Sequence, residues 1–373
     1  MKTDRLEHTS DCIRSESAPL LERGAICASA KSEVRSAAEA PGEVRTDALH
    51  GQLVRELSAA GCFRPATAWT IVHALAIIVT YSAAYLILLT DPGPGVRLLA
   101  IAALSAVCLQ AGFVGHEAGH GAVTRHQPLA RWIGQVFQTL LTAVCYSYFQ
   151  HIHRAHHPHC NERSRDPDMQ SSIFSLYSES ASSKKGFGKI VSRHQAYLIW
   201  ILVCLQGFSL KVDSFNFLRR NVRATRSDQT MLLLHLGLWL VLPALVLGFW
   251  NALFNYALMT LLCGPYLGAI FLVNHIGTRV VEPGETVTFF MQELSTTRNL
   301  GDSPLHSFLF GGLNNHIEHH LFPSMPTARL RTARQITRAF CRRHGLSYRE
   351  LSWFAAAREV FAHFKAISAL VPR

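Results

Sequence analysis

The sequence predicts an all-α integral membrane protein in which four transmembrane helices form two hairpins and carry a cytoplasmic helical cap. Of the 373 residues, 49% are hydrophobic and only 16% are charged, whereas soluble domains contain about 25% charged residues. The uncharged stretches are long enough for two pairs of membrane crossings, and the basic residues gather in the segments between them. Composition, uncharged length and charge distribution therefore predict the same architecture.

Residues 1–64 differ in composition from the rest of the chain. They are polar, rich in Ala, Ser, Glu and Arg, and have no basic start followed by an apolar core as in a secretory signal. We expect them to be mostly disordered, with an amphipathic turn near residues 49–57. The membrane domain is expected at 65–350 and a helical tail, to which the sequence assigns no function, at 351–373.

The first predicted hairpin has spans at about 66–90 and 97–115. Residues 66–90 contain no charged side chain over 25 residues, and residues 98–115 contain none over 18. The sequence DPGPG at 91–95 separates them and is typical of a turn. Each stretch is long enough to cross the bilayer as a helix.

The second predicted hairpin has spans at about 230–250 and 252–274. No Asp, Glu, Lys or Arg occurs in the 50 residues from 229 to 278. One helix of that length would extend about 75 Å, more than twice the bilayer core of about 30 Å. The chain must therefore fold back, and the sequence FWN at 249–251 predicts an interfacial turn.

The basic residues predict the orientation of both hairpins. Nine Lys and Arg precede residue 66, 14 lie in 116–228 and 12 follow residue 278, which leaves Arg97 alone for the far side. The positive-inside rule then places both termini and the middle region in the cytoplasm. The net charge of +11 is therefore explained by topology and lipid contact, and nucleic acid is not an expected partner.

Two other segments are expected at the membrane surface. Residues 195–210 are apolar but number only 16, which favours an interfacial or re-entrant helix, and residues 131–150 mix aromatic side chains with Gln. Nine cysteines occur without a C-x-x-C pair, so neither a thiolate zinc site nor a disulfide framework is indicated.

Histidines with metal-ligand spacing gather on the predicted cytoplasmic side. His116 and His120 follow the second span at i, i+4 spacing, which puts both imidazoles on one helical face. Two H-x-x-H-H sets lie at 153–157 and 316–320, and a further histidine ends the fourth span at the expected depth of His116. The nine residues are His116, His120, His153, His156, His157, His275, His316, His319 and His320.

A metal centre explains these sets better than surface or capping roles do. A lone H-x-x-x-H is usually a surface pair, but three sets on one side of a membrane protein favour metal binding. Zinc is normally satisfied by four ligands, or by three and a water, so nine imidazoles imply two ions. Imidazole suits iron, copper, nickel and zinc alike and does not choose between them.

Two other classes of membrane protein fit part of the pattern. The sequence HEAGH at 116–120 satisfies the H-E-x-x-H motif of zinc proteases, in which Glu117 would be the general base. An intramembrane zinc protease leaves both H-x-x-H-H sets without a role. A metal transporter would place its ligands inside the spans, where only His73 and His235 occur, without a matching carboxylate.

The three histidine sets resemble the membrane fatty acid desaturase family, whose boxes read H-x-x-x-H, H-x-x-H-H and H or Q-x-x-H-H. The resemblance covers roughly residues 66–350. The run from His156 through Asn161 to Asp166-Pro167-Asp168 is similar to that family's HH, N, DPD run. Residues 311–326 (GGLNNHIEHHLFPSMP) are similar to the end of acyl-lipid and front-end desaturases in particular.

The resemblance implies that the nine histidines bind two iron ions, and that O2-dependent chemistry removes two hydrogens from adjacent methylenes of an acyl chain. Unactivated C–H bonds require a redox-active metal, which zinc is not. Because no heme-binding HPGG sequence occurs, electrons are expected from a separate donor such as ferredoxin or cytochrome b5. The acyl carrier, whether lipid, CoA or carrier protein, is left open.

Related enzymes with the same ligand set act as hydroxylases, ketolases or acetylenases, because the outcome depends on how the substrate carbons lie relative to the oxidant. These alternatives also stay open. Front-end desaturases carry Gln at the first position of the third box, where this chain has His316, so the position of a double bond is not predicted.

Polar residues near the boxes are expected to orient the imidazoles through their free ring N–H groups, as metal-bound histidines usually require. His151 and His159 flank the second box out of register and are expected to support it or to lie at the surface. The expected orienting residues are Glu117, Asn161, Asp166, Asp168 and Glu318. The histidines expected to be exposed or structural are His126, His194, His306, His344 and His363.

Overall fold

The structure, a computed structural model, describes residues 41–171 and 173–372. Every regular element in these two ranges is helical, and their extended pairings are limited to two isolated bridges, Glu162 with Val281 and Asn299 with Glu350. The all-α prediction is therefore confirmed for the described part of the chain. Residues 1–40, which belong to the segment expected to be disordered, lie outside the described residues.

Five helical segments in the described ranges are long and apolar enough to cross a membrane. Four of them coincide with the two predicted hairpins, and the fifth contains the segment 195–210 that the sequence predicts as interfacial. The five are α4 (Thr67–Leu89), α5 (Pro94–Gly119), Gly186–Arg220 (α9 Gly186–Leu202, η6 Val203–Leu205, α10 Gln206–Arg220), Arg226–Leu247 (α11 Arg226–Leu236, η7 Gly237–Val241, α12 Leu242–Leu247) and α13 (Phe249–His275).

The turn of the second hairpin lies earlier than the sequence predicts. The chain reverses at Gly248, whose φ of 86° is accessible to glycine without steric cost. Phe249 and Trp250, expected in the turn, instead begin α13 with exposed side chains. The aromatic pair lies directly beside the turn, but the backbone reverses at the residue that tolerates a positive φ.

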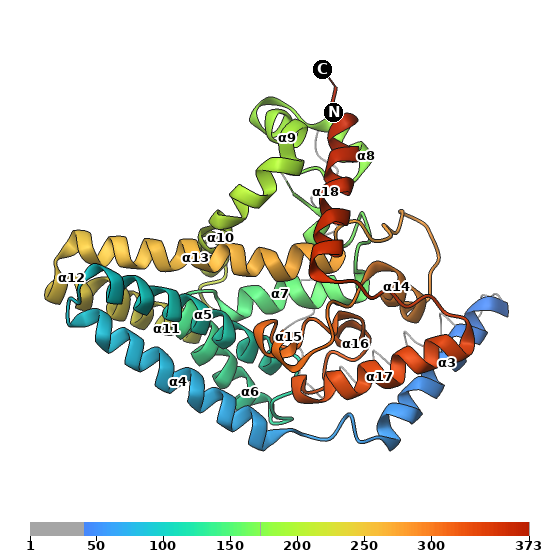
Figure 1. Cartoon of the computed structure of the whole chain (residues 1–373), viewed down its shortest axis with the longest axis horizontal. Coiled ribbons are helices and arrows are strands. Elements are labelled where there is room, and N and C mark those ends of the chain that lie inside the picture. Colours follow the sequence, from blue (N-terminus) through green and yellow to red (C-terminus); the bar gives the residue numbers. More distant parts are fainter. Residues whose placement is uncertain (1–40, 172, 373) are drawn as a thin grey trace. The chain divides into compact units, whose positions relative to one another are not determined.

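Helices α4, α5 and α13 and the segment Arg226–Leu247 form an apolar bundle (Figure 1). Its interior includes Leu104, Cys108, Trp239 and Met259, all buried. The outer surface is apolar too: Leu245, for example, is 81% exposed. Exposed apolar surface on this scale is expected of helices that face lipid.

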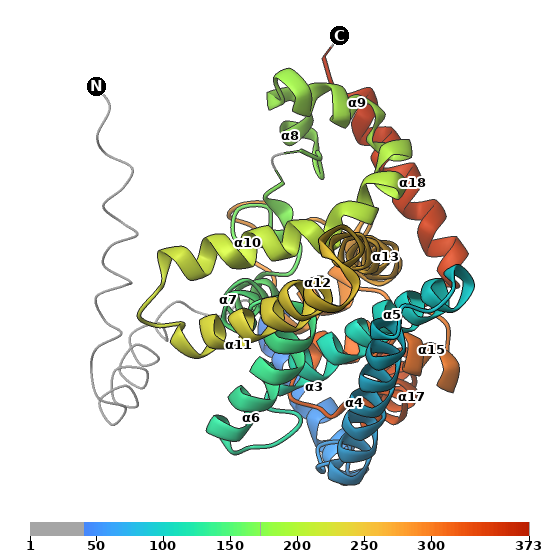
Figure 2. The ribbon, with the colours of Figure 1, turned by 90° about the vertical axis from the view of Figure 1, so that its left-hand side faces the viewer.

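The segment α9–α10 runs across the bundle rather than along it. In Figure 1 α13 lies horizontally, and in Figure 2 it is seen nearly end-on, whereas α9 and α18 (Trp353–Ala369) run from top to bottom in both views. In Figure 2 α10 also lies in the plane of the picture. Val360 and Phe364 of α18 pack with Ile199 of α9 and Ile270 of α13. Within the tail expected at 351–373, residues Trp353–Ala369 form a helix that packs on α9 and α13.

Short helices build the cap over one end of the bundle, and they bring segments that are distant in sequence to the histidines. They are α6 (Gln127–Gly134), η3 (Gln135–Leu140), α7 (Tyr146–His156), η4 (His157–His159), η5 (Pro167–Met169), α14 (Phe289–Thr296), α15 (Pro304–Leu309), α16 (His316–Leu321) and α17 (Thr327–His344). Helix α8 (Ser178–Ser183) lies apart from them and packs on α18 (Figure 1).

The expectation of disorder through residue 64 differs from the structure at α3 (Pro41–Ala59), which is helical. Leu53 and Leu57, one helical turn apart, are buried against Phe290 of α14 and Ile317 of α16. The sequence shows this apolar stripe only as a short amphipathic turn. The stripe forms a stable helix because partners supplied by residues more than 200 positions away cover it.

Candidate metal centre

Five histidines meet at the cap end of α5, and we call them cluster 1. The last turn of α5 and its C-cap supply two of them, α7 and η4 supply two, and α16 supplies the fifth. Their ligand atoms lie within 4.8 Å of one another. The members of cluster 1 are His116, His120, His153, His157 and His319.

The ring nitrogens of cluster 1 converge on His153. Its Nε2 atom lies 2.8 Å from Nε2 of His116, 2.9 Å from Nε2 of His120 and 3.0 Å from Nε2 of His157. One imidazole nitrogen offers either one N–H or one lone pair. It therefore cannot satisfy three imidazole neighbours, and a cation between them could.

Four histidines form cluster 2 beside the first: His156, His275, His316 and His320. Ligand atoms of His156, His275 and His320 lie within 4.8 Å of one another, and Nε2 of His316 lies 2.6 Å from Nε2 of His275. The rings of His157 and His320 bring the two clusters together, with centroids 4.3 Å apart.

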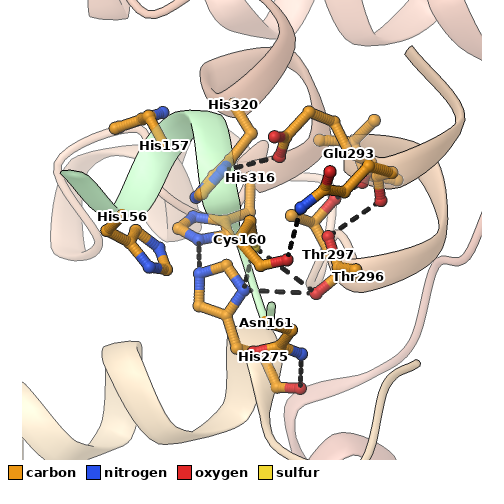
Figure 3. A network of polar contacts seen from close by, with 12 residues as sticks. His156, His157, Cys160, Asn161, His275, Glu293, Thr296, Thr297, His316 and His320 are labelled. Atoms are coloured by element: carbon orange, nitrogen blue, oxygen red, sulfur yellow. Dashed lines mark hydrogen bonds and ion pairs between the residues drawn. The ribbon is translucent and has the colours of Figure 1, made fainter. Parts of the chain in front are cut away.

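Outward-facing Nδ1 atoms of cluster 2 have hydrogen-bond partners, of which Figure 3 shows those of His320 and His275. His156 Nδ1 lies 3.0 Å from both carboxylate oxygens of Asp166, and His320 Nδ1 lies 2.9 Å from Glu293 Oε2. His275 Nδ1 lies 3.2 Å from the carbonyl oxygen of Thr296. An Nδ1–H that donates outward leaves the Nε2 lone pair directed into the cluster, where a metal ligand needs it.

Of the five residues expected to orient imidazoles, two contact an imidazole ring. These are Asp166 and, at 3.5 Å from His156 Nδ1, Asp168. The hydrogen bonds of the other three go elsewhere. Glu117 accepts from the backbone N–H of Thr327, Asn161 donates to Thr278 and to backbone carbonyls, and Glu318 accepts from Asn299 and Tyr348.

Glu293 and Thr296 contact cluster 2 but carry no sequence motif. Both lie on α14, at least twenty residues from any histidine box, and Glu293 is fully buried. The one available signal is an isolated acid in the otherwise uncharged run FFMQELSTT at 289–297. A buried carboxylate of this kind needs a partner, and the sequence does not say that the partner is His320.

Burial and charge act differently on the two clusters. Burial lowers the pKa of His153, His157 and His319 well below the usual value, and neighbouring imidazoles lower it further. Burial also lowers the pKa of His156, but the carboxylates of Asp168, Asp166 and Glu293 outweigh it and raise that pKa to about 9. A positive charge is therefore favoured beside the carboxylates of cluster 2.

Cys160 is close to cluster 2 without being a suitable ligand. Its sulfur lies 3.3 Å from Nδ1 of His275, on the outward side of that ring. Burial raises the pKa of the thiol well above its usual value, and a neutral thiol binds metal poorly because the thiolate is the ligand. Cys160 therefore packs behind His275.

Two glycines of α5 let the cap approach cluster 1. A Cβ at Gly119 would lie 1.7 Å from Nε2 of Gln150 on α7, and a Cβ at Gly115 would lie 2.6 Å from Cβ of Gln138 on η3. Both glycines lie one position before a box histidine. Their missing side chains let α7 and η3 pack closely enough for His153 to reach His116.

Two adjoining cavities lead to the clusters. The larger, of about 290 Å³, contacts His153, His156, His275, His316 and His320. The smaller, of about 90 Å³, lies between α5, α10 and α13 and reaches His116. Four mainly apolar wall residues belong to both, so the two cavities adjoin as parts of one largely apolar space: Phe149, Leu210, Leu267 and Phe271.

Two imidazole clusters thus lie beside a largely apolar space in a helical chain with five segments of membrane-spanning length among its described residues. Residues 92–352 match the family model of fatty acid desaturases. The chain belongs to the fatty acid desaturase family.

Its curated relatives are similar over about 70% of the chain. It is 27% identical to Delta(8)-fatty-acid desaturase 2 of Arabidopsis thaliana, covering 70% of this chain and 61% of the relative. It is 26% identical to an acyl-lipid (9-3)-desaturase of Borago officinalis, over 68% and 59%. It is 24% identical to a Delta 8-(E)-sphingolipid desaturase of Kluyveromyces lactis, over 71% and 51%. The chain thus spans between half and two thirds of the length of these relatives.

Proposed function

We propose that the chain is an O2-dependent di-iron desaturase that introduces a double bond into a lipid acyl chain. The observation that carries the proposal is the convergence of nine imidazoles in two adjoining clusters at the end of an apolar cavity. Family membership supports the reaction class. The separation into five and four histidines supports two metal positions, with His116, His120, His153, His157 and His319 at one and His156, His275, His316 and His320 at the other.

Unpaired nitrogens support metal binding at both positions. Nε2 of His319 and Nε2 of His320 are buried and have no hydrogen-bond partner among the described residues. A buried polar atom without a partner costs free energy, which a bound cation would offset. Nitrogen donors suit iron, and the buried carboxylates Asp166 and Glu293 add negative charge beside cluster 2.

The overall reaction defines what the electron donor, the solvent and the cavity residues must supply. Reduction of one O2 to two waters takes four electrons and four protons; the two C–H bonds supply two of each, and an external donor and solvent supply the rest. Bound iron would supply the redox chemistry that activates O2. The apolar wall around Leu210, Leu267 and Phe271 would hold the alkyl chain, exclude water and fix which methylenes face the histidines.

Geometry also supports four membrane crossings. His157 and His319 have ring centroids 4.8 Å apart, so an even number of crossings must separate them. Arg226–Leu247 and α13 supply two crossings, and α9–α10 runs across α13 (Figure 2). We therefore propose that Gly186–Arg220 lies at the membrane interface, with the histidines and both termini in the cytoplasm.

The position of Glu117 disfavours a zinc protease. Its Oε1 atom accepts a hydrogen bond of 2.7 Å from the backbone N–H of Thr327, and its side chain is buried. A general base must face a metal-bound water, whereas Glu117 joins α5 to the start of α17.

Lipid analysis tests the function. The chain is expressed with a compatible electron donor, and total lipids are profiled by mass spectrometry. A new acyl species two mass units lighter than its precursor is expected, and it should be absent from a His156→Ala strain. A species sixteen units heavier would indicate a hydroxylase instead, and an unchanged profile with the donor present would contradict the proposal.

A further inference from the structure

The proposed reaction needs two electrons from outside in each turnover, so the irons need a surface at which a donor can dock. This inference rests on the proposed function and concerns the part of the surface at which the electron donor binds. The structure limits the choice, because most of the nine histidines are buried.

Of the nine histidines, His120 is the one that is partly exposed without lining either described cavity. Only His120, His153 and His275 of the nine are partly exposed. His153 and His275 line the larger cavity, which accounts for their exposure. His120 lines neither cavity described above. Because His120 is the C-cap of α5, we take its exposed edge to face the surface around the loop that follows α5.

That surface is basic. Arg125 lies in the loop after His120, Arg131 lies on α6 and Arg154 lies on α7 beside His153, and all three are exposed. Arg154 is near enough to His120 for its charge to help lower the pKa of that imidazole. Burial raises the pKa of Tyr146, and the charges of Arg154 and Arg131 both oppose that rise, so both arginines lie near this residue. We call these three arginines the α6–α7 patch.

No acidic residue balances the α6–α7 patch locally. From residue 118 to residue 161 the sequence contains no Asp and no Glu, and no carboxylate of the described residues lies within ion-pair distance of the three arginines. Two arginines on α17 differ from the patch, because Arg338 pairs with Asp302 and Glu350, and Arg343 pairs with Glu56. The positive charge of the patch is therefore available to a partner.

We propose that the α6–α7 patch is the docking surface for a soluble one-electron carrier protein with an acidic face, and that electrons reach the metal centre past His120. Unpaired arginines attract an acidic partner and orient it during encounter. Trp132 and Leu129 of α6 are 55% and 45% exposed and supply apolar contact area beside the arginines. Trp and Arg are the residue types most enriched at the energetic centres of interfaces.

A binding measurement tests the patch independently of turnover. The full chain is reconstituted in nanodiscs of uncharged phosphatidylcholine, and its Kd for a soluble acidic [2Fe–2S] ferredoxin is measured. The test variant is Arg125→Glu/Arg131→Glu/Arg154→Glu. The matched control is Arg342→Glu/Arg358→Glu/Lys365→Glu, which makes the same change in net charge at exposed residues on α17 and α18.

The test variant should bind at least about tenfold more weakly, and the control should stay within about twofold. The wild-type affinity should fall steeply with ionic strength. Equal losses in both variants, or no loss in either, would overturn the proposal. It would also be overturned if the test variant kept its ferredoxin affinity and lost only binding to phosphatidylglycerol vesicles, because the patch would then be a lipid-binding surface.

Product analysis tests the docking surface separately from the proposed function. With dithionite as the electron source, the test variant and wild type should form the same amount of desaturated product, and with ferredoxin only wild type and control should. Equal ferredoxin-driven turnover in all three proteins contradicts the docking surface alone. No product from the wild type with either reductant contradicts the proposed function.

Discussion

The two histidine clusters contain the same side chain, but they are oriented in different ways. In cluster 2, carboxylates and a backbone carbonyl hold the outward nitrogens of His156, His320 and His275. In cluster 1, no carboxylate of the described residues contacts an imidazole, and close helix packing at Gly119 and Gly115 sets the geometry. The difference teaches that one metal position depends on hydrogen bonds and the other on the shape of the backbone.

Loss of a ligand should abolish activity in either cluster. His156→Ala and His120→Ala each remove a nitrogen from a set that holds a metal, so product should fall below detection while the protein still accumulates in membranes. The matched control is His306→Ala, since the His306 side chain belongs to neither cluster and hydrogen-bonds to Ser303 at the start of α15. Retained product in His156→Ala would remove that residue from the proposed ligands.

Loss of a carboxylate should affect cluster 2 selectively. In Asp166→Asn and Glu293→Gln the shape is kept but the negative charge beside His156 or His320 is lost. Removal of such a partner typically lowers metal affinity or activity about 10–100-fold. Metal analysis should find close to one iron lost per chain. Loss of both irons together would show that the two clusters do not fill independently.

A small added side chain should affect cluster 1 selectively. Gly119→Ala places a Cβ against the amide of Gln150, and overpacking of this kind is destabilising. We expect activity to fall up to about tenfold. Because the obstacle is the end of a flexible side chain, Gly119→Ala/Gln150→Ala should regain most of the activity. Failure of the double variant to recover would mean that Gly119 matters for another reason.

The pH dependence of metal uptake compares the clusters without any mutation. The carboxylates around His156 raise its pKa to about 9, so below that pH the metal-free protein holds a proton there that a metal ion must displace. Uptake at cluster 2 should strengthen as the pH rises towards about 9 and then level off. Burial keeps His153 and His157 neutral above pH 6.5, so uptake at cluster 1 should be flat. Calorimetry in buffers of different ionisation enthalpy would reveal the proton, and its absence would contradict this account.

The sequence predicts the helical class and names the nine histidines that meet in the structure, because both depend on local patterns. Uncharged stretches identify the spans, and i, i+3 and i+4 spacing identifies imidazoles that share a helical face. Glu293 and Thr296 escape prediction because their contacts with His320 and His275 arise only when α14 folds onto α16 and α13.

The same limit applies to the differences in the fold. The helix around Leu53 and Leu57 needs Phe290 and Ile317 to cover it, so its own sequence signal is weak. The turn at Gly248 depends on a positive φ. A hydropathy pattern carries no information on backbone angles, so it points to the neighbouring aromatic residues instead.

Metal analysis of the purified protein tests the central claim most directly. The protein should contain close to two irons per chain, with nitrogen-rich coordination by X-ray absorption spectroscopy, and the Asp166→Asn variant should contain about one. One zinc per chain without iron would contradict the di-iron assignment and would favour a zinc enzyme.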